Sequence, residues 1–279
     1  MAGVPVELLS ARDHGLPPDL RLAATLYLPP APGFSSALMR PRVPGLVVGH
    51  GAGSRASRHE EFCLRACEHG FAVIAPDLRG HGDSDGSGDG PMEQDILAAV
   101  RFMRSHPAVD PDAICYRGSS MGGFYGLKSA PLAGFAALVL ICPASEEVML
   151  SAIRDEETDE GSTRRHTKTT VDTEAPGESS PAVTRWDRQR LRAYFERQDS
   201  RQLAALVQCP VLLVHVRSDR QVPFGHSLEL VRHLRTDVTL LALQHGSHSS
   251  AQHDERVHSE SLSWLRARLD ARRTTPREA

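Results

Sequence analysis

The sequence predicts an α/β fold in which helices cover both faces of a mostly parallel sheet. Short and almost continuously apolar runs, such as Gly45–Gly49 and Pro210–Val216, alternate with stretches of helical periodicity along the 279-residue chain. Strands of a parallel sheet are apolar on both sides because helices pack against both faces. A turn rich in glycine and serine, at residues 118–122, joins one apolar run directly to a helical pattern.

The N-terminal half begins with two β-type runs, Val4–Leu9 and Leu20–Leu28, which are expected to pair antiparallel. Gly70 is a natural C-terminal stop for the helix that precedes it. In order, the next expected elements are a strand at Gly45–Gly49, a helix at Arg58–His69, a strand at Phe71–Pro76, a helix through Met92–Met103, a strand at Ala113–Gly118 and a helix from Met121.

The C-terminal half repeats this alternation. Pro210 stands at the first position of its strand, where no hydrogen bond of the sheet is lost. The remaining expected elements are strands at Ala136–Cys142, Pro210–Val216 and Val238–Leu243, a helix at Ser227–Leu234, and a closing helix marked by Val257, Leu262, Leu265 and Leu269.

One segment interrupts the pattern between two expected strands. From Arg154 to Ser180 only Val171 and Ala175 are aliphatic and no residue is aromatic, so this stretch buries too little surface to order itself. Apolar anchors return at Trp186, Leu191, Tyr194 and Phe195. We therefore expect one domain over residues 1–279 with a lid or cap insertion at residues 145–205, flexible at first and helical later. A plain surface loop is the alternative.

Composition excludes several classes of protein. The formal net charge of −3 gives no reason to expect nucleic acid or an anionic membrane as partner. The longest apolar run, Phe135–Cys142, is far shorter than the roughly 20 residues of a membrane span. The N-terminus lacks the pattern of a signal peptide, and the five cysteines form neither a disulfide framework nor a zinc spacing. We expect a cytoplasmic protein.

The motif with the clearest chemistry is Gly118-Ser-Ser-Met-Gly122, which fits G-x-S-x-G with Ser120 in the centre. A serine on a tight strand-to-helix turn needs glycines beside it because the backbone crowds itself there. The helix that follows favours negative charge at its N-terminus. Ser119 does not fit, since Arg117 stands where a glycine is needed. Ser120 is the candidate nucleophile.

A second glycine-rich loop, His50-Gly-Ala-Gly53, directly follows the strand at Gly45–Gly49. Acyl transfer needs two backbone amides that point at the developing oxyanion. The amide of Met121, next to the nucleophile, and that of Ala52 are the candidates for this oxyanion hole. A glycine turn without a role is the alternative.

A serine hydroxyl is a weak nucleophile until a base takes its proton. His248 follows the last expected strand, with His245 and His253 as rivals. Asp219 follows the penultimate strand and is the candidate acid that orients the base. The resulting chain order of serine, aspartate and histidine differs from that of chymotrypsin and subtilisin.

Together these motifs resemble the α/β-hydrolase superfamily, in its serine-esterase, monoacylglycerol-lipase-like or dienelactone-hydrolase-like branches. The resemblance covers roughly residues 20–143 and 207–270, and it rests on the HGAG loop, on Pro76–Gly86 (PDLRGHGDSDG), on the serine turn and on Asp219–Pro223 (D-x-x-V-P). It implies an α/β-hydrolase fold with an eight-stranded sheet and a lid after strand six. Because some members place the acid after strand six, Glu146 is a rival of Asp219. Arg217 departs from the glycine that often precedes the acid.

We expect an enzyme that cleaves a small carboxylic ester through an acyl-enzyme on Ser120 and that needs no cofactor. Thioesterase or acyl-peptidase activity on the same residues, and a non-catalytic binding protein on a hydrolase scaffold, remain open. Residues 83–94 resemble the front of a calcium loop, but Gln94 stands where a bidentate glutamate is needed. The histidines near the C-terminus lack the spacing of a zinc site.

Overall fold

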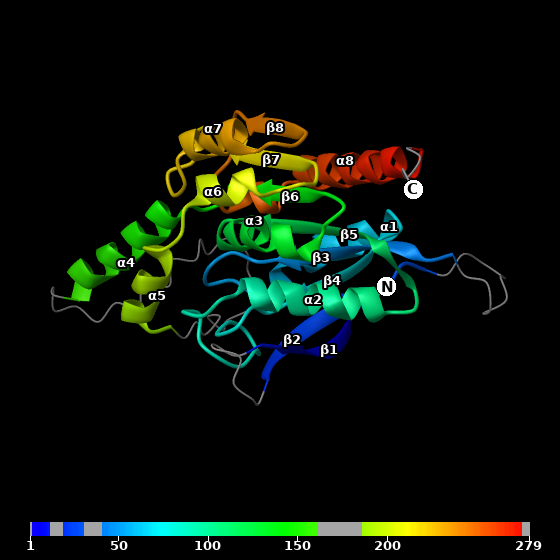
Figure 1. Ribbon diagram of the computed structural model, residues 1–279, viewed down its shortest axis with the longest axis horizontal. Helices are drawn as coiled ribbons and strands as arrows, with labels where there is room; N and C mark the ends of the chain where they lie inside the picture. Colours follow the sequence, from blue (N-terminus) through cyan, green and yellow to red (C-terminus); the bar gives the residue numbers. More distant parts are fainter. Residues whose placement is uncertain (1, 12–18, 31–40, 161–185, 275–279) are drawn as a thin grey trace.

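The computed structural model describes residues 2–11, 19–30, 41–160 and 186–274. Eight strands form one sheet in the order β1-β2-β4-β3-β5-β6-β7-β8 (Figure 1). Strand β2 pairs antiparallel with β1 and β4, and all pairs from β4 to β8 are parallel. The strands are β1 Val4–Ser10, β2 Leu20–Tyr27, β3 Val43–Gly49, β4 Ala72–Pro76, β5 Val109–Ser119, β6 Leu138–Ile141, β7 Val211–Val216 and β8 Val238–Leu243. The predicted mostly parallel, eight-stranded sheet is confirmed.

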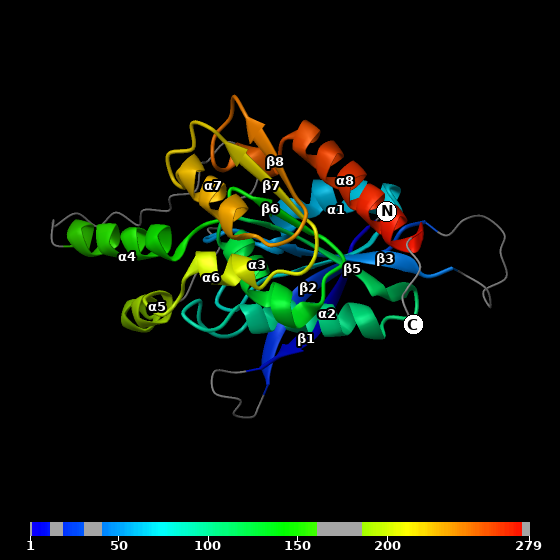
Figure 2. The same cartoon turned by 45° about the horizontal axis from the view of Figure 1, so that its top comes forward.

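Helices cover both faces of this sheet, as Figure 2 shows, with α1 and α8 on one side and α2 and α3 on the other. The helices are α1 Glu60–Glu68, α2 Glu93–Ser105, α3 Met121–Ala133, α4 Glu146–Glu160, α5 Arg188–Phe195, α6 Ser200–Ala205, α7 Phe224–His233 and α8 Glu255–Thr274, and two 3-10 turns are η2 Ala56–His59 and η3 Ser250–Gln252. None of the helices in the described ranges is both long and apolar enough to cross a membrane.

The apolar strands supply two separate cores because successive side chains point to opposite faces. In β3, Val47 packs into the core under α2 and α3, whereas Leu46 and Val48 pack into the core under α1 and α8. Strand β7 alternates in the same way, with Leu213 on the first side and Leu212 on the second. Each such side chain contributes about 1.5–3 kcal/mol when fully buried, which explains why both faces of these strands are apolar.

The segment between β6 and β7 is more helical than expected. Helix α4 continues through Arg154 to Glu160, where the composition favoured a flexible chain. The rest of the stretch with few apolar residues, 161–185, lies outside the described residues. Helix α5 follows an Asp187 cap whose side chain accepts from the Arg190 amide, and it buries Leu191 and Phe195, two of the expected anchors.

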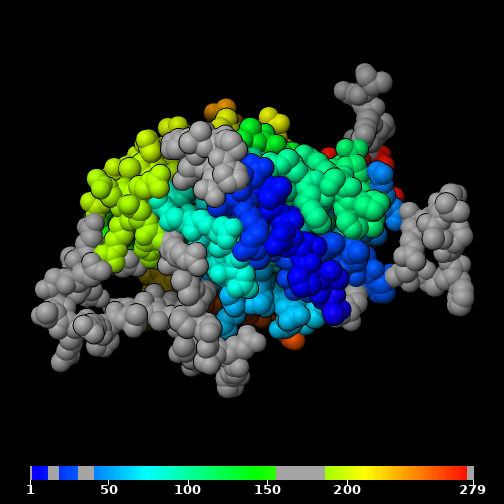
Figure 3. Space-filling model, turned by 90° about the horizontal axis from the view of Figure 1, so that it is seen from below, coloured from blue at the N-terminus to red at the C-terminus, as the bar shows by residue number. Residues whose placement is uncertain are grey.

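Helix α5 is docked on the body of the molecule. Figure 3 shows its yellow-green atoms against the cyan segment that follows β4. The Tyr194 hydroxyl accepts a hydrogen bond from Lys128 (2.7 Å) and donates one to Glu93 (2.9 Å). Phe195 is fully buried, and its ring centroid lies 5.4 Å from that of Phe124 in α3. These contacts fix α5 against α2 and α3.

Candidate active site

Ser120 lies on the sharp turn between β5 and α3, with φ 50° and ψ −117°. A left-handed φ strains a residue other than glycine by about 1–3 kcal/mol, so its surroundings must hold it in place. The Ser120 amide donates to the Ile141 carbonyl (2.9 Å), and the Ser120 carbonyl accepts from the amides of Phe124 (3.1 Å) and Ala144 (3.0 Å). The turn is therefore fixed to the end of β6 as well as to α3.

The glycines around Ser120 are required by close packing. A Cβ on Gly122 would lie 2.5 Å from the Gly49 carbonyl oxygen and 2.6 Å from that of His50. A Cβ on Gly118 would lie 2.5 Å from the Gly122 carbonyl oxygen. All three distances are shorter than real Cβ contacts, so only glycine lets α3 begin directly against the end of β3.

The HGAG loop runs beside the serine turn. A Cβ on Gly51 would lie 3.5 Å from the Ser120 Cβ. Ala52 is exposed, and Met121 is buried at the start of α3. The structure therefore brings the loop that carries Ala52 next to Ser120, on the side where α3 presents its N-terminal amides.

The ring of His50 holds this loop in shape. Its Nε2 accepts a hydrogen bond from the Leu78 amide (2.9 Å), so the ring proton is on Nδ1 and is donated to the Gly51 carbonyl (2.8 Å). Burial lowers the pKa of His50 to about 3, and the ring stays neutral near pH 7. This role was missed in the sequence, where His50 was counted only as part of a glycine-rich loop.

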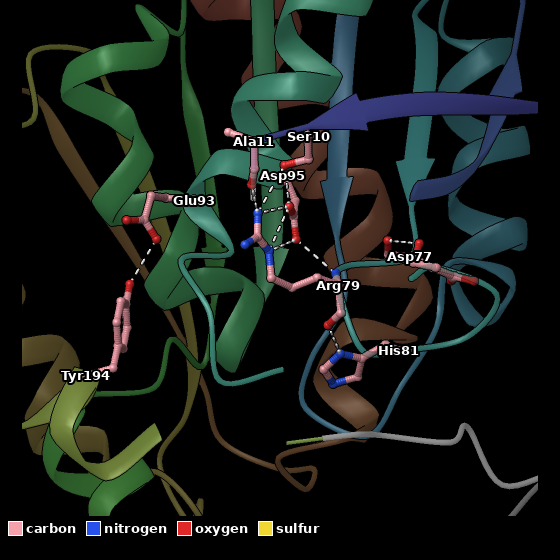
Figure 4. A network of polar contacts seen from close by, with 9 residues as sticks. Ser10, Ala11, Asp77, Arg79, His81, Glu93, Asp95 and Tyr194 are labelled. Carbon is pink, nitrogen blue, oxygen red and sulfur yellow. Dashed lines mark hydrogen bonds and ion pairs between the residues drawn. The ribbon is translucent and has the colours of Figure 1, made fainter. Parts of the chain in front are cut away.

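The loop after β4 supports the HGAG loop and the residues that follow it through hydrogen bonds. The two carboxylate oxygens of Asp77 accept from the amides of Ala56 (2.7 Å) and Asp83 (2.9 Å). Deeper in the same loop, the Arg79 guanidinium binds both oxygens of Asp95, and Ser10 donates to the same carboxylate (Figure 4). Both members of this ion pair are buried. The Pro76–Gly86 motif is thus a structural support of the candidate oxyanion loop.

Asp219 and His248 are brought together at the carboxyl ends of β7 and β8. His248 Nδ1 donates to Asp219 Oδ2 over 2.7 Å, and Asp219 Oδ1 accepts from the amides of Gln221 (2.9 Å) and Val222 (3.0 Å). Burial acts to raise the pKa of Asp219, but hydrogen bonds from His248 and from these amides outweigh it and lower the pKa below its usual value. Asp219 is therefore ionised near pH 7, and it fixes the tautomer of His248 that leaves Nε2 as an acceptor.

His215 and Cys142 lie beside the Asp219 carboxylate, and the sequence analysis missed both. Their nearest nitrogen and sulfur atoms lie within 4.8 Å of each other and of an Asp219 oxygen. The His215 ring already has two partners, because Nε2 donates to the Val222 carbonyl (2.9 Å) and Nδ1 accepts from Ser227 (2.7 Å). Because the Val222 amide in turn donates to Asp219, His215 fits a support of the loop that holds the carboxylate better than a metal ligand. A histidine inside an otherwise apolar strand was the available signal.

The rival residues have other partners. Glu146 accepts from the Ser200 amide at the start of α6 (3.0 Å). His245 is exposed, and the His253 ring stacks on His59 with centroids 5.8 Å apart.

The carboxylates of the calcium-like segment pair separately, Asp83 with Arg55, Asp85 with Arg21 and Asp89 with Arg190.

The eight-stranded sheet with a serine turn after β5 can be compared with known proteins. A family model described as the alpha/beta hydrolase family matches residues 46–260. The chain belongs to the alpha/beta hydrolase family. Among curated relatives, the chain is similar to the uncharacterized peptidase YtmA of Bacillus subtilis (strain 168), with 27% identity over 62% of this chain and 61% of that protein. The match thus spans less than two thirds of that relative's length.

Solved structures share the fold of this chain over nearly its whole length. A complex of DcsB with its substrate analogue has a TM-score of 0.71 and 18% identity, and the match covers 97% of this chain and 99% of that chain. Est1E from Butyrivibrio proteoclasticus with bound ferulic acid has a TM-score of 0.67 and 20% identity, over 90% of this chain and 96% of that chain. At these identities the likeness establishes the fold alone.

Proposed function

We propose that this hydrolase cleaves a small carboxylic ester through an acyl-enzyme on Ser120. The observation that carries the proposal is the 2.7 Å hydrogen bond between His248 and Asp219, at the same end of the sheet as the strained Ser120 turn. A base oriented by a buried carboxylate, together with a serine raised on a turn, is the arrangement that nucleophilic acyl transfer needs.

In the proposed reaction, Ser120 Oγ attacks the acyl carbonyl carbon while His248 Nε2 takes the hydroxyl proton. The tetrahedral oxyanion accepts hydrogen bonds from the amides of Ala52 and Met121. Collapse of this intermediate expels the alcohol, which receives the proton from His248. A water molecule then attacks the acyl-enzyme with His248 again as base, and the acid is released. Asp219 holds the imidazole and stabilises its charged form, and no step calls for a cofactor.

Residues 145–205 are proposed to act as a cap over this site. The Ala144 amide donates to the Ser120 carbonyl, and α4 begins two residues later at Glu146. The proposed cap therefore begins directly beside the candidate nucleophile, and near its C-terminal end α5 packs against α2 and α3. A reducing, cytoplasmic location remains a prediction, supported by five cysteines that are all free and buried.

Acyl-peptidase activity on the same residues is the second candidate, because the relative YtmA is named a peptidase. An amide and an ester pass through the same tetrahedral intermediate, so the described geometry accommodates both. The two activities differ in the leaving group that His248 must protonate.

A substrate panel tests the proposal. Wild-type protein and Ser120→Ala are compared on p-nitrophenyl esters of increasing acyl length, on one thioester and on one aminoacyl amide. We expect the wild type to turn over short esters fastest and Ser120→Ala to lose this activity. Preference for the aminoacyl amide would favour the peptidase. A wild type without activity on any member would favour a binding protein on a hydrolase scaffold.

A further inference from the structure

Gln252 connects the loop that carries His248 to the strand that carries Ser120. Its side-chain Oε1 accepts a hydrogen bond from the Ser119 hydroxyl (2.5 Å), and its main-chain carbonyl accepts one from Arg117 Nη2 (2.7 Å). Ser119 directly precedes the candidate nucleophile, and Arg117 lies two residues before Ser119 on β5. Two side chains of one strand thus bind one residue of the histidine loop.

The donor of this second contact, the Arg117 side chain, lies inside the protein. The guanidinium is fully buried and stacks over the Phe62 ring, 3.9 Å from its centroid. Burial lowers the pKa of Arg117 to about 10, so the group stays charged near pH 7. Among the described residues no carboxylate forms an ion pair with it, and the Gln252 carbonyl is the acceptor for its charge-assisted hydrogen bond. Such a bond is strong where water is excluded.

Hydrogen bonds within the loop that carries His248 connect this anchor to the histidine. The Ser247 amide donates to Ser250 Oγ (2.8 Å), and the amides of Ser250 and Ala251 donate to Ser247 Oγ (3.1 Å) and to its carbonyl (3.3 Å). These bonds link the residue before His248 to the turn that ends at Gln252. A second donor, His258 Nε2 in α8, also binds the Gln252 carbonyl (2.8 Å).

We propose that Gln252, held by Ser119 and Arg117, is a positioning residue that sets the distance between His248 and Ser120. Asp219 orients the histidine from the loop after β7, and Gln252 connects the end of the loop that carries His248 to β5. The inference rests on the proposed function, because the positioned groups are the base and the nucleophile of that reaction. A displacement of about 1 Å between reacting groups is enough to cost a factor of about 100 in rate.

The test removes each partner of the Gln252–Ser119 hydrogen bond in turn, and a third variant keeps an acceptor for it. We expect Gln252→Ala and Ser119→Ala each to lower kcat on the best ester by about 10-fold to 100-fold, with KM nearly unchanged. The double variant should lose little more than either single one, because both remove the same bond. Gln252→Glu keeps an oxygen acceptor for the Ser119 hydroxyl and should recover most of the activity.

Asp254→Ala is the matched control. Asp254 Oδ1 accepts from the Val257 amide in the first turn of α8 (3.0 Å), just beyond Gln252. This variant should lower Tm without lowering kcat, which separates positioning from general destabilisation. Ser119→Ala keeps the test informative should Gln252→Ala fail to fold.

The outcomes separate the inference from the proposed function. A wild type without Ser120-dependent hydrolysis overturns both. An active wild type whose kcat is unchanged in Gln252→Ala and Ser119→Ala overturns the inference alone. Three other results also overturn the inference alone. These are additive losses in the double variant, equal losses in Gln252→Glu and Gln252→Ala, and a comparable loss of kcat in Asp254→Ala.

Discussion

The Asp219 carboxylate and the His248 ring meet through a 2.7 Å hydrogen bond although 29 residues separate them in the chain. The Asp219 side chain is completely buried, whereas 9% of the His248 side chain is exposed. One end of the imidazole is therefore fixed inside the protein, and the ring reaches toward the surface. This geometry gives the two residues different and separately testable roles.

Asp219→Asn should keep the shape of the site but present an amide in place of the charge. The wrong imidazole tautomer is then favoured, and turnover should fall by about 10⁴-fold, as in the closest catalytic analogy. Steady-state kinetics on the best ester measures this loss. Glu146→Gln should have a small effect, because the Glu146 carboxylate caps α6 through Ser200. A severe loss in Glu146→Gln with a mild one in Asp219→Asn would move the acid to the end of β6.

His248→Ala should abolish turnover, and His245→Ala should leave it nearly intact. His248 donates to the buried Asp219, whereas His245 is exposed three residues earlier in the loop. Both variants are compared on the same ester, with circular dichroism as the check of folding. Activity that survives in His248→Ala and disappears in His245→Ala would reverse the assignment of the base.

The sheet and the serine turn were predictable because their causes are local. Apolar residues on both sides of β3 and β7 indicate strands buried between helices, and a tight turn at Ser120 leaves room only for glycine at Gly118 and Gly122. The chain order of motifs also led to Asp219 and His248, which the structure brings together.

Helix α4 and two hydrogen-bonded pairs were not predicted, for different reasons. Helix α4 extends through charged residues up to Glu160, because Glu and Arg are good helix formers even where few apolar residues are present. The partners of His215 and Gln252, Ser227 and Ser119, lie 12 and 133 residues away in the chain. Such pairs follow from tertiary packing, so one sequence alone could not identify them.

His59→Leu should weaken the dependence of stability on pH. His59 is buried, neither ring nitrogen has a hydrogen-bond partner within the described part of the chain, and burial holds its pKa well below the usual value. Below about pH 6.5 the His59 imidazole is protonated in the unfolded chain but stays neutral in the folded protein. As the pH falls below this value, the wild type should therefore lose about 1.4 kcal/mol of unfolding free energy per pH unit because of this residue.

Urea unfolding of wild type and His59→Leu at pH 7.5 and pH 5.5 measures this difference. The variant should be about as stable as the wild type at the higher pH, because no hydrogen bond is lost, and clearly more stable at the lower pH. Equal pH dependence in the two proteins would contradict the prediction.

Tyr194→Phe should loosen the docking of α5. The hydroxyl bridges Lys128 and Glu93, so its removal leaves two partly buried polar groups with one partner fewer. We expect a loss of about 1–3 kcal/mol in the free energy of unfolding, measured with urea. Glu196→Ala, an exposed change at the end of α5, is the control and should stay within about 0.5 kcal/mol of the wild type. A loss in the control as large as that in Tyr194→Phe would refute the bridging role.

The central claim is that Ser120 is a nucleophile activated by His248. Incubation with a fluorophosphonate probe, digestion and mass spectrometry of the labelled peptide tests it most directly, since the probe reacts covalently with an activated serine. We predict one adduct, on Ser120, that forms in the wild type, is absent from Ser120→Ala and forms far more slowly in His248→Ala. An unlabelled wild type, or an adduct that persists in Ser120→Ala, would contradict the account.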